Sequence, residues 1–250
     1  MRFFSLFLGL IVSFNLMSKE VVKVGVYDFP PYAFVSGEIR GITVQVLEAM
    51  NRFQQDYEFV AVPTTARRRY LDFDNGEFEM LIFESINWGW QGHDVHASDV
   101  FVKGAEVYVT QAQPGRGQAY FTDFKNKLMI GVLGYHYQFA DFSGDQEYLR
   151  QKFNMIQTEG QQKSLELILK GRGDIAVLTK EYLNYHFLTS PRDRKKLLIS
   201  VKYDQIYEHT ILIRKQHKLA LAHINRLLAS MHEAGSLKPI WQKYGLEQVY

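Results

Sequence analysis

Short apolar runs rich in β-branched residues alternate with helical patterns along most of the chain. Residues 21–26 (VVKVGV) are almost continuously apolar, which is typical of a strand that is covered on both faces. Gly41 then precedes Ile42, Val46 and Met50, which share one face of a helix. Further strands are expected at residues 59–62, 80–83, 107–110, 128–132, 175–178, 197–201 and 210–213. This alternation predicts an α/β fold with mainly parallel sheets flanked by helices.

Glycines mark the ends of two later helical patterns. A helix carrying Leu165 and Ile168 is expected to end at Gly171, because glycine accepts the left-handed conformation that closes many helices. The last long helix, with apolar positions between 221 and 231, is expected to stop at Gly235. The segment 111–117, which contains Gln, Gly and Pro, interrupts the alternation near the middle of the chain. We interpret it as a crossing or a loop between two lobes.

The first residues differ from the rest of the chain. Arg2 is followed by a nearly unbroken apolar run over 3–16, and charged sequence resumes at Lys19. The run is shorter than the roughly 20 residues of a membrane-spanning helix and is typical of a signal peptide. We therefore expect residues 1–18 to direct export to the periplasm. An uncleaved anchor is the alternative, because residues 16–18 (LMS) are not a clean small-x-small cleavage site.

The overall composition narrows the functional classes. Of the 250 residues, 46% are hydrophobic, and 29 basic residues against 27 acidic ones leave a net charge of +2. This balance lacks the basic surface of a nucleic-acid-binding protein, so no nucleic acid is expected as a partner. The chain has no cysteine, which excludes disulfides and a lipid-modified cysteine.

Several local motifs, taken in order, resemble the bacterial extracellular solute-binding proteins of family 3. They are residues 29–32 (FPPY), 41–42 (GI), 76–82 (GEFEMLI), 98–99 (SD), 123–134, 171–177 (GRGDIAV) and 235–245 (GSLKPIWQKYG). Each motif is weak alone, but their order and spacing cover nearly the whole exported chain.

The resemblance implies a two-lobed periplasmic-binding-protein fold whose two crossing strands form a hinge. Residues 19–110 and 207–250 would form the first lobe and 111–206 the second. The implied protein is a monomer without a cofactor that traps a small ligand between its lobes for an ABC-type importer. A periplasmic sensor that serves a membrane signalling partner is an alternative, because the two roles use the same exported lobes.

The chain departs from the family where amino-acid receptors carry their charged contacts. The arginine that commonly binds the ligand's α-carboxylate corresponds to Gln91 in an ungapped count. The aspartate that commonly meets the α-amino group corresponds to Thr179. Losing a charged hydrogen bond costs about 1.5–3 kcal/mol, so a standard polar amino acid is not the expected ligand.

Aromatic and acidic side chains stand in the expected cleft instead. Such a surface suits an aromatic, sugar-like or cationic ligand. The first-lobe candidates for ligand contact are Tyr27, Phe29, Tyr32, Glu84, Trp88, Trp90 and Gln91. In the run 67–69 (RRR), we expect Arg67 to turn into the cleft, where it would hold an anionic group. From the second lobe we expect Tyr135 and His136, with backbone N–H groups that can receive an anion, and Thr179.

The sequence supports a catalytic or metal-binding function less than it supports solute binding. His93 and His96 lack a third ligand in a metal-binding spacing, so no metal site is expected. No nucleophile motif or phosphate-binding loop is present. The enzymatic alternative is a protein resembling cyclohexadienyl dehydratases, in which Glu84 would act as a general acid. We expect a binding protein rather than an enzyme.

Overall fold

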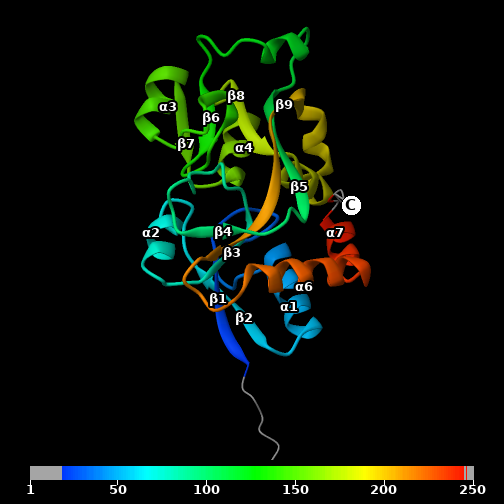
Figure 1. Cartoon of the computed structure of the whole chain (residues 1–250). Helices are drawn as coiled ribbons and strands as arrows, with labels where there is room; N and C mark the ends of the chain where they lie inside the picture. Colours follow the sequence, from blue (N-terminus) through cyan, green and yellow to red (C-terminus); the bar gives the residue numbers. More distant parts are fainter. Residues whose placement is uncertain (1–18, 245, 247–250) are drawn as a thin grey trace, which may run out of the picture.

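The chain folds into two α/β lobes stacked on one another, as the computed structural model shows for residues 19–244 and 246 (Figure 1). The strands are β1 (Glu20–Val26), β2 (Tyr57–Pro63), β3 (Met80–Glu84), β4 (Val95–Ala97), β5 (Val102–Gln111), β6 (Met129–Val132), β7 (Met155–Thr158), β8 (Ile175–Thr179) and β9 (Leu197–Arg214). The α-helices are α1 (Ile42–Phe53), α2 (Arg69–Asp74), α3 (Gln146–Phe153), α4 (Gln161–Leu169), α5 (Lys180–Thr189), α6 (Leu221–Glu233) and α7 (Lys238–Tyr244). Short 3₁₀ helices are η1 (Gln118–Phe121), η2 (Gln138–Ala140) and η3 (Pro191–Lys196). The α/β class and the two-lobed architecture expected from the sequence are confirmed.

The strands follow the order β2-β1-β3-β9-β5-β8-β6-β7, and β4 pairs with β9. Within the first lobe β1 is parallel to β2 and β3, and within the second lobe β6 is parallel to β7 and β8. The antiparallel strands β5 and β9 connect these groups, because β9 pairs with both β3 and β5. In Figure 1, β9 runs from the upper lobe into the lower one.

Strand β9 is longer than the sequence pattern predicted. Two short strands were expected at 197–201 and 210–213, but one strand covers Leu197–Arg214 without a break. The polar residues between them concealed the strand, because Asp204 and Gln205 are buried and bind partners near the lobe junction. These polar side chains form hydrogen bonds at the lobe junction, so they do not indicate a loop.

The segment 111–117 lies at the far end of the second lobe. Gln111 pairs with Leu197, at the opposite end of the β5–β9 pair from Val102 and His209. Within β5, residues 106–109 already pair with β8 of the second lobe. The lobe limits expected from the sequence remain a prediction.

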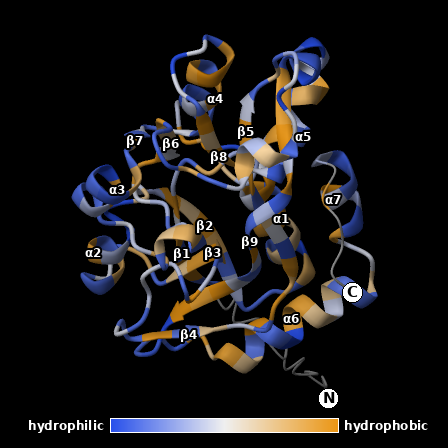
Figure 2. Cartoon of the chain, turned by 90° about the horizontal axis from the view of Figure 1, so that it is seen from above, coloured by the Kyte–Doolittle hydropathy of each residue, from blue (hydrophilic) through white to orange (hydrophobic). Residues whose placement is uncertain are grey.

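Helices cover the sheets and bury the apolar faces predicted for them. Helix α1 packs on β2, and α4 packs on β8 and β6. Helix α4 is followed by Gly171 at φ 66° and α6 by Gly235 at φ 66°, as expected of glycines that close helices. Figure 2 shows hydrophobic residues concentrated on the strands and on one side of the helices. The sequence pattern did not predict β4, β7, α3 or α5, which are short or weakly periodic.

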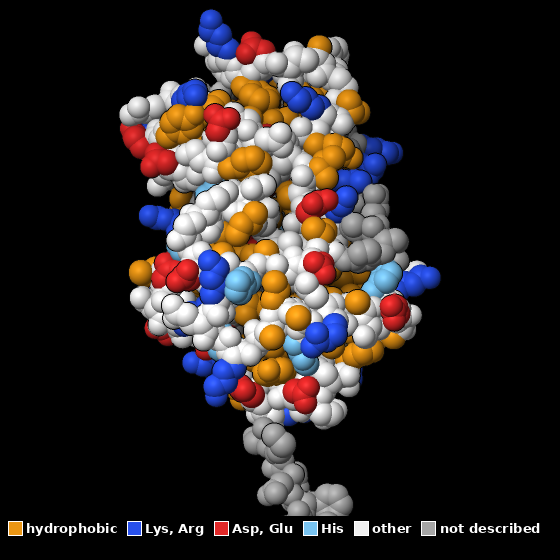
Figure 3. Space-filling view, in the orientation of Figure 1, with side chains coloured by type: hydrophobic (Ala, Val, Ile, Leu, Met, Phe, Trp, Pro, Cys, Tyr) orange, Lys and Arg blue, Asp and Glu red, His pale blue; other side chains and the backbone are white. Residues whose placement is uncertain are grey.

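Charged side chains of both signs are interspersed over the face shown in Figure 3, in agreement with the small net charge. Within the described part of the chain, no helix combines the length and the apolar character needed to cross a bilayer. The signal peptide expected at 1–18 lies outside the described residues.

Candidate functional site

An aromatic cluster lies where the two lobes meet. Strand β1 ends at Val26, and the chain then turns back on itself, so that Phe29 and Ala33 pair across the turn. The ring centroid of Phe29 lies 4.8 Å from that of Tyr32, 6.0 Å from that of Trp88 and 5.6 Å from that of Tyr135. Because Tyr135 follows β6 in the second lobe, the cluster includes rings from both lobes.

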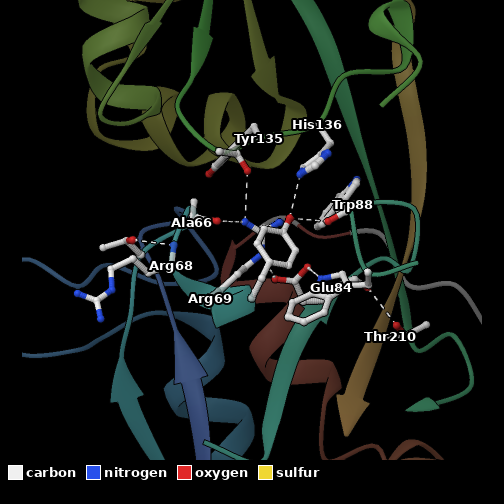
Figure 4. Close-up of polar contacts among 12 residues, drawn as sticks. Ala66, Arg68, Arg69, Glu84, Trp88, Tyr135, His136 and Thr210 are labelled. Atoms are coloured by element: carbon white, nitrogen blue, oxygen red, sulfur yellow. Dashed lines mark hydrogen bonds and ion pairs between the residues drawn. The ribbon is translucent and has the colours of Figure 1, made fainter. Parts of the chain in front are cut away.

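A buried ion pair adjoins these rings in the first lobe. Arg69 Nε lies 3.1 Å from Glu84 Oε1, and the two side chains are 2% and 0% exposed. Trp90 Nε1 donates a hydrogen bond of 2.9 Å to Glu84 Oε2. The guanidinium also lies over the rings of Tyr27 and Tyr70, at 4.9 and 4.4 Å from their centroids. Figure 4 shows this group at the junction of the lobes.

Local backbone geometry positions both members of the ion pair. Helix α2 begins at Arg69 and buries only Arg69 and Phe73, one turn apart on the same face. Strand β3 has a bulge between Ile82 and Glu84, and Phe83 between them has a φ of 63°. A bulge changes the direction in which the following side chain points. Glu84 therefore meets the inward face of α2.

Burial and pairing have opposite effects on the ionisation of Arg69 and Glu84. Burial raises the pKa of Glu84, whereas Arg69, Trp90 and Tyr27 oppose that rise. Burial lowers the pKa of Arg69, but Glu84, Tyr27, Tyr70 and Tyr135 together outweigh burial, so the pKa of Arg69 is raised overall. Since the guanidinium keeps its proton, a neutral Glu84 would leave a buried charge without a partner.

Hydrogen bonds join the lobes around this group. Arg69 Nη1 donates to Gly134 O at 3.2 Å, and Tyr70 Oη lies 2.8 Å from His136 Nε2. Trp88 Nε1 donates to Gln205 Oε1 at 3.2 Å. Burial lowers the pKa of His136 to about 4, so its ring is neutral at physiological pH. The lobes are thus closed on each other through side chains of the candidate site.

A small cavity remains among these residues. Its volume is about 10 Å³, roughly the space of one water molecule. The lining residues are Tyr27, Phe29, Arg69, Trp88, Glu106, Gly134, Tyr135 and His136. A larger ligand therefore requires the lobes to separate.

Most residues proposed from the sequence lie in or beside this cavity. Tyr27, Phe29, Trp88, Tyr135 and His136 line it. Tyr32 stacks behind Phe29, and Glu84 and Trp90 support Arg69.

The other proposed residues lie elsewhere. Arg67 and Gln91 are exposed and do not line the cavity. Thr179 is 1% exposed and caps α5, where its hydroxyl accepts from Tyr182 N and donates to Gln161 Oε1.

The sequence interpretation missed Arg69 and Glu106. Arg69 is four residues before the apolar Phe73, and this spacing pointed to an inward face. The signal was ambiguous, because Arg67 is likewise four residues before an apolar residue, Leu71, which is exposed in the structure. Glu106 stands between the apolar Ala105 and Val107, and such an alternation in a strand predicts a solvent-facing side chain, so no signal in the sequence indicated its burial.

Three backbone N–H groups that follow β6 have partners within the protein. Tyr135 N donates to Val132 O. At the start of η2, Gln138 N and Phe139 N donate to the carboxylate of Asp204 at 2.9 and 3.0 Å. The backbone group that faces the cleft is instead the carbonyl of Gly134, which accepts from Arg69.

The residues considered as metal ligands do not converge. His93 Nδ1 lies 2.9 Å from Asp74 Oδ1, and His96 is exposed on β4. Among the described residues, no group of at least three His, Asp or Glu side chains is arranged to hold a metal ion.

Comparison with solved structures supports the same architecture. The chain is similar to a mutant of ArgBP from T. maritima, with a TM-score of 0.70, 20% identity and coverage of 90% of this chain and 94% of that chain. It is also similar to the GluR0 ligand-binding core in complex with L-glutamate, with a TM-score of 0.71, 16% identity and coverage of 91% and 99%. A third similar structure is the ancestral amino acid-binding protein AncCDT-1, a precursor of cyclohexadienyl dehydratase, with a TM-score of 0.67, 14% identity and coverage of 90% and 95%. At these identities the likeness establishes the fold alone.

No curated protein sequence matches the chain. The family model for bacterial extracellular solute-binding proteins, family 3, matches residues 22–247, which is most of the chain. The motifs identified in the sequence are distributed over the same range, and the two lobes have the expected architecture. The chain therefore belongs to the bacterial extracellular solute-binding proteins of family 3.

Proposed function

We propose that this protein captures a small solute between its two lobes and closes around it. The observation that carries the proposal is the cavity at the lobe junction, which receives Phe29 and Trp88 from one side and Tyr135 and His136 from the other. Aromatic rings combined with few polar groups are typical of small-molecule sites. A site shared between lobes couples binding to their closure.

The protein is further proposed to act in the periplasm after export by residues 1–18. Family membership and the apolar run at 3–16 support this location. In this role a monomer would deliver its ligand to an ABC-type importer in the inner membrane. A sensor that presents its occupied form to a membrane signalling protein is the alternative partner arrangement. For the protein itself, we propose that residues 19–110 and 207–250 form the first lobe and residues 111–206 the second.

The proposed ligand is not a standard polar amino acid. Gln91 is exposed and Thr179 caps a helix, so neither supplies the charge that amino-acid receptors of the family use at those positions. Arg69 is committed to Glu84, Ala66 and Gly134. Asp204 accepts from Gln138 N and Phe139 N at the start of η2, so these two groups are not available to an α-carboxylate.

Catalysis of the dehydratase type is the weaker proposal. It requires a cleft carboxyl group that can give up a proton. Glu84 accepts from Trp90 and is paired with Arg69, which favours its ionised form. Incubation with prephenate or arogenate tests this directly, and product formation would contradict a purely binding role.

A thermal-shift screen tests the capture of a solute. The screen includes amines, aromatic acids, sugars and the standard polar amino acids, and we expect at least one compound outside the last group to raise the melting temperature. A ligand at 100 times its dissociation constant stabilises the folded protein by about 2.7 kcal/mol. Trp88→Ala and Tyr135→Ala should each reduce this shift, because their rings come from opposite lobes.

Tyr203→Ala is the matched control, because Tyr203 is 38% exposed on β9 and does not line the cavity. A melting temperature that no compound changes would contradict solute capture. A shift produced by a standard polar amino acid would contradict the ligand exclusion and leave solute capture intact.

A further inference from the structure

The cavity between the lobes has an imbalance of charge. Arg69 is the basic residue of its lining, and Glu84 neutralises it at 3.1 Å. Glu106 is the acidic residue of the same lining. It lies on β5 and is only 3% exposed. No ion pair to Glu106 forms among the described residues. The cavity as a whole therefore carries one carboxyl group without a counter-charge.

Glu106 is held in place by a neutral hydrogen-bond chain. Gln205 Nε2 donates to Glu106 Oε2 at 2.6 Å and also to His136 O at 2.7 Å. Gln205 Oε1 accepts from Trp88 Nε1 at 3.2 Å. An amide positions a carboxyl group but supplies no charge to it.

The groups around Glu106 add negative rather than positive charge. Asp204 on β9 and Glu181 on α5 are both buried, and their charges act on Glu106. The remaining titratable groups that interact with it or share its cavity are Tyr27 after β1, Tyr108 on β5, Tyr135, His136 and Tyr137 after β6, Tyr207 on β9, and Arg69 on α2. The tyrosines and His136 are uncharged at neutral pH. An anionic ligand would meet this carboxyl group without a free cation to offset it.

Aromatic rings surround the space in front of Glu106. Tyr27, Phe29, Trp88 and Tyr135 all line the cavity, and the Phe29 ring meets those of Trp88 and Tyr135 edge to face. Rings arranged around a cation attract it electrostatically, and quaternary ammonium groups are commonly bound in this way. The rings and the carboxyl group thus favour the same kind of ligand.

We propose that the solute carries a positively charged nitrogen, which the aromatic rings enclose and for which Glu106 is the counter-charge. This inference rests on the proposed capture of a solute in the cleft, and it names the chemical class as small organic ammonium or guanidinium ions.

Proton release should accompany binding of such a cation. Burial raises the pKa of Glu106 well above its ordinary value, and Asp204 adds to the rise. An arriving positive charge lowers the pKa of Glu106, so binding of the cation is linked to proton release from this carboxyl group. The affinity should therefore increase with pH and become constant once Glu106 is already ionised in the free protein.

Calorimetric titration with choline, agmatine, putrescine and phenethylamine tests the proposal. The controls are the uncharged isostere of choline, 3,3-dimethylbutan-1-ol, and the anionic 3,3-dimethylbutanoate. We expect at least one cation to bind and both isosteres to fail. Repeating the titration in two buffers of different ionisation enthalpy should reveal protons released to the buffer at neutral pH.

Glu106→Gln should weaken binding of that cation by about 30-fold or more, because one partner of a buried charge pair is lost. Glu208→Gln is the matched control, since Glu208 is exposed and paired with Lys103 on the surface. It should leave the affinity unchanged. Proton release by the unmodified protein needs no variant, so it tests the same inference even when Glu106→Gln does not fold.

The outcomes separate the two proposals. Binding of a neutral or anionic compound with unchanged affinity in Glu106→Gln would overturn the cationic ligand and leave solute capture intact. Cation binding without proton release and without dependence on Glu106 would also overturn it. Failure of every compound in this titration and in the thermal-shift screen would contradict solute capture itself.

Discussion

The Arg69–Glu84 pair shows how a single residue contact organises the first-lobe side of the cleft. Both side chains are essentially inaccessible, so each relies on the other for its electrostatic partner. Separating such a pair by changing one member is costly, whereas replacing both with uncharged residues of similar volume often is not. The pair therefore sets the direction of Arg69 more than it contributes net stability.

Glu84→Gln should lower the free energy of unfolding by about 3–5 kcal/mol, because it leaves the buried guanidinium without a counter-charge. The double change Arg69→Met with Glu84→Gln should recover most of that loss. Urea-induced unfolding measures both effects. Glu147→Gln in the exposed pair with Arg150 is the control and should hardly move the midpoint. If Glu84→Gln and Glu147→Gln lowered the free energy of unfolding equally, this role of the pair would be refuted.

At the scale of elements, strand β9 links the two lobes and also carries part of the site. Its first part pairs with β5, and its last part pairs with β3 and β4. Within the part that pairs with β5, Tyr207 faces Gly104 across the ladder. A side chain at Gly104 would collide with the Tyr207 ring, because an added Cβ would lie 2.2 Å from Cε2. The packing of the Tyr207 ring against β5 thus requires glycine here.

Gly104→Ala should destabilise the protein by about 1–3 kcal/mol, the usual effect of overpacking a filled interior. It should also weaken solute binding, because Tyr207 packs against Trp88 with ring centroids 4.9 Å apart. Gly117→Ala is the matched control, since an added Cβ there meets no atom within 4 Å and the φ of Gly117 is −124°. Denaturant melts and titration with the solute measure the two effects. Loss of stability without loss of affinity would restrict Gly104 to a packing role.

At the scale of the whole molecule, the lobes are held together by a few polar contacts around a water-sized cavity. Tyr70 on α2 reaches across to His136, and its hydroxyl also lies 2.5 Å from Trp88 O. Tyr135 Oη donates to Asp28 O at 3.3 Å, and Gln161 Nε2 donates to Pro30 O at 3.4 Å. Because opening breaks these polar contacts as well as the ring contact between Phe29 and Tyr135, small changes in them should shift the balance between open and closed lobes.

Tyr70→Phe should favour the open arrangement, because it removes the hydroxyl that contacts the second lobe. Small-angle X-ray scattering without solute should then give a larger radius of gyration than that of the unmodified protein. Saturating solute should restore the smaller value. Tyr120→Phe removes a hydroxyl that contacts Asp174 within the second lobe, so it should leave the radius unchanged. An identical change in both variants would rule out a specific role for Tyr70 in closure.

The α/β class, the two-lobed architecture and the family follow from the sequence because they depend on local patterns spread along the chain. Apolar runs over 21–26 and 175–178 predicted strands, and Gly171 and Gly235 predicted helix ends, since each signal involves only neighbouring residues. The aromatic residues of the candidate site were also proposed from the sequence, because they follow the ends of expected strands, where the cleft was expected to lie.

Only the tertiary structure decided which charged side chains enter the cleft. Arg69 rather than Arg67 turns inward. The residue at which α2 begins decides which of the three successive arginines lies on the buried face of the helix. Glu106 reaches the cavity because β5 pairs with β9 in a register that brings it beside Gln205. These placements depend on helix phase, strand register and the meeting of two lobes, all of which join residues far apart in the chain. The sequence by itself therefore determined the kind of protein, and the folded structure decided the charge of its site.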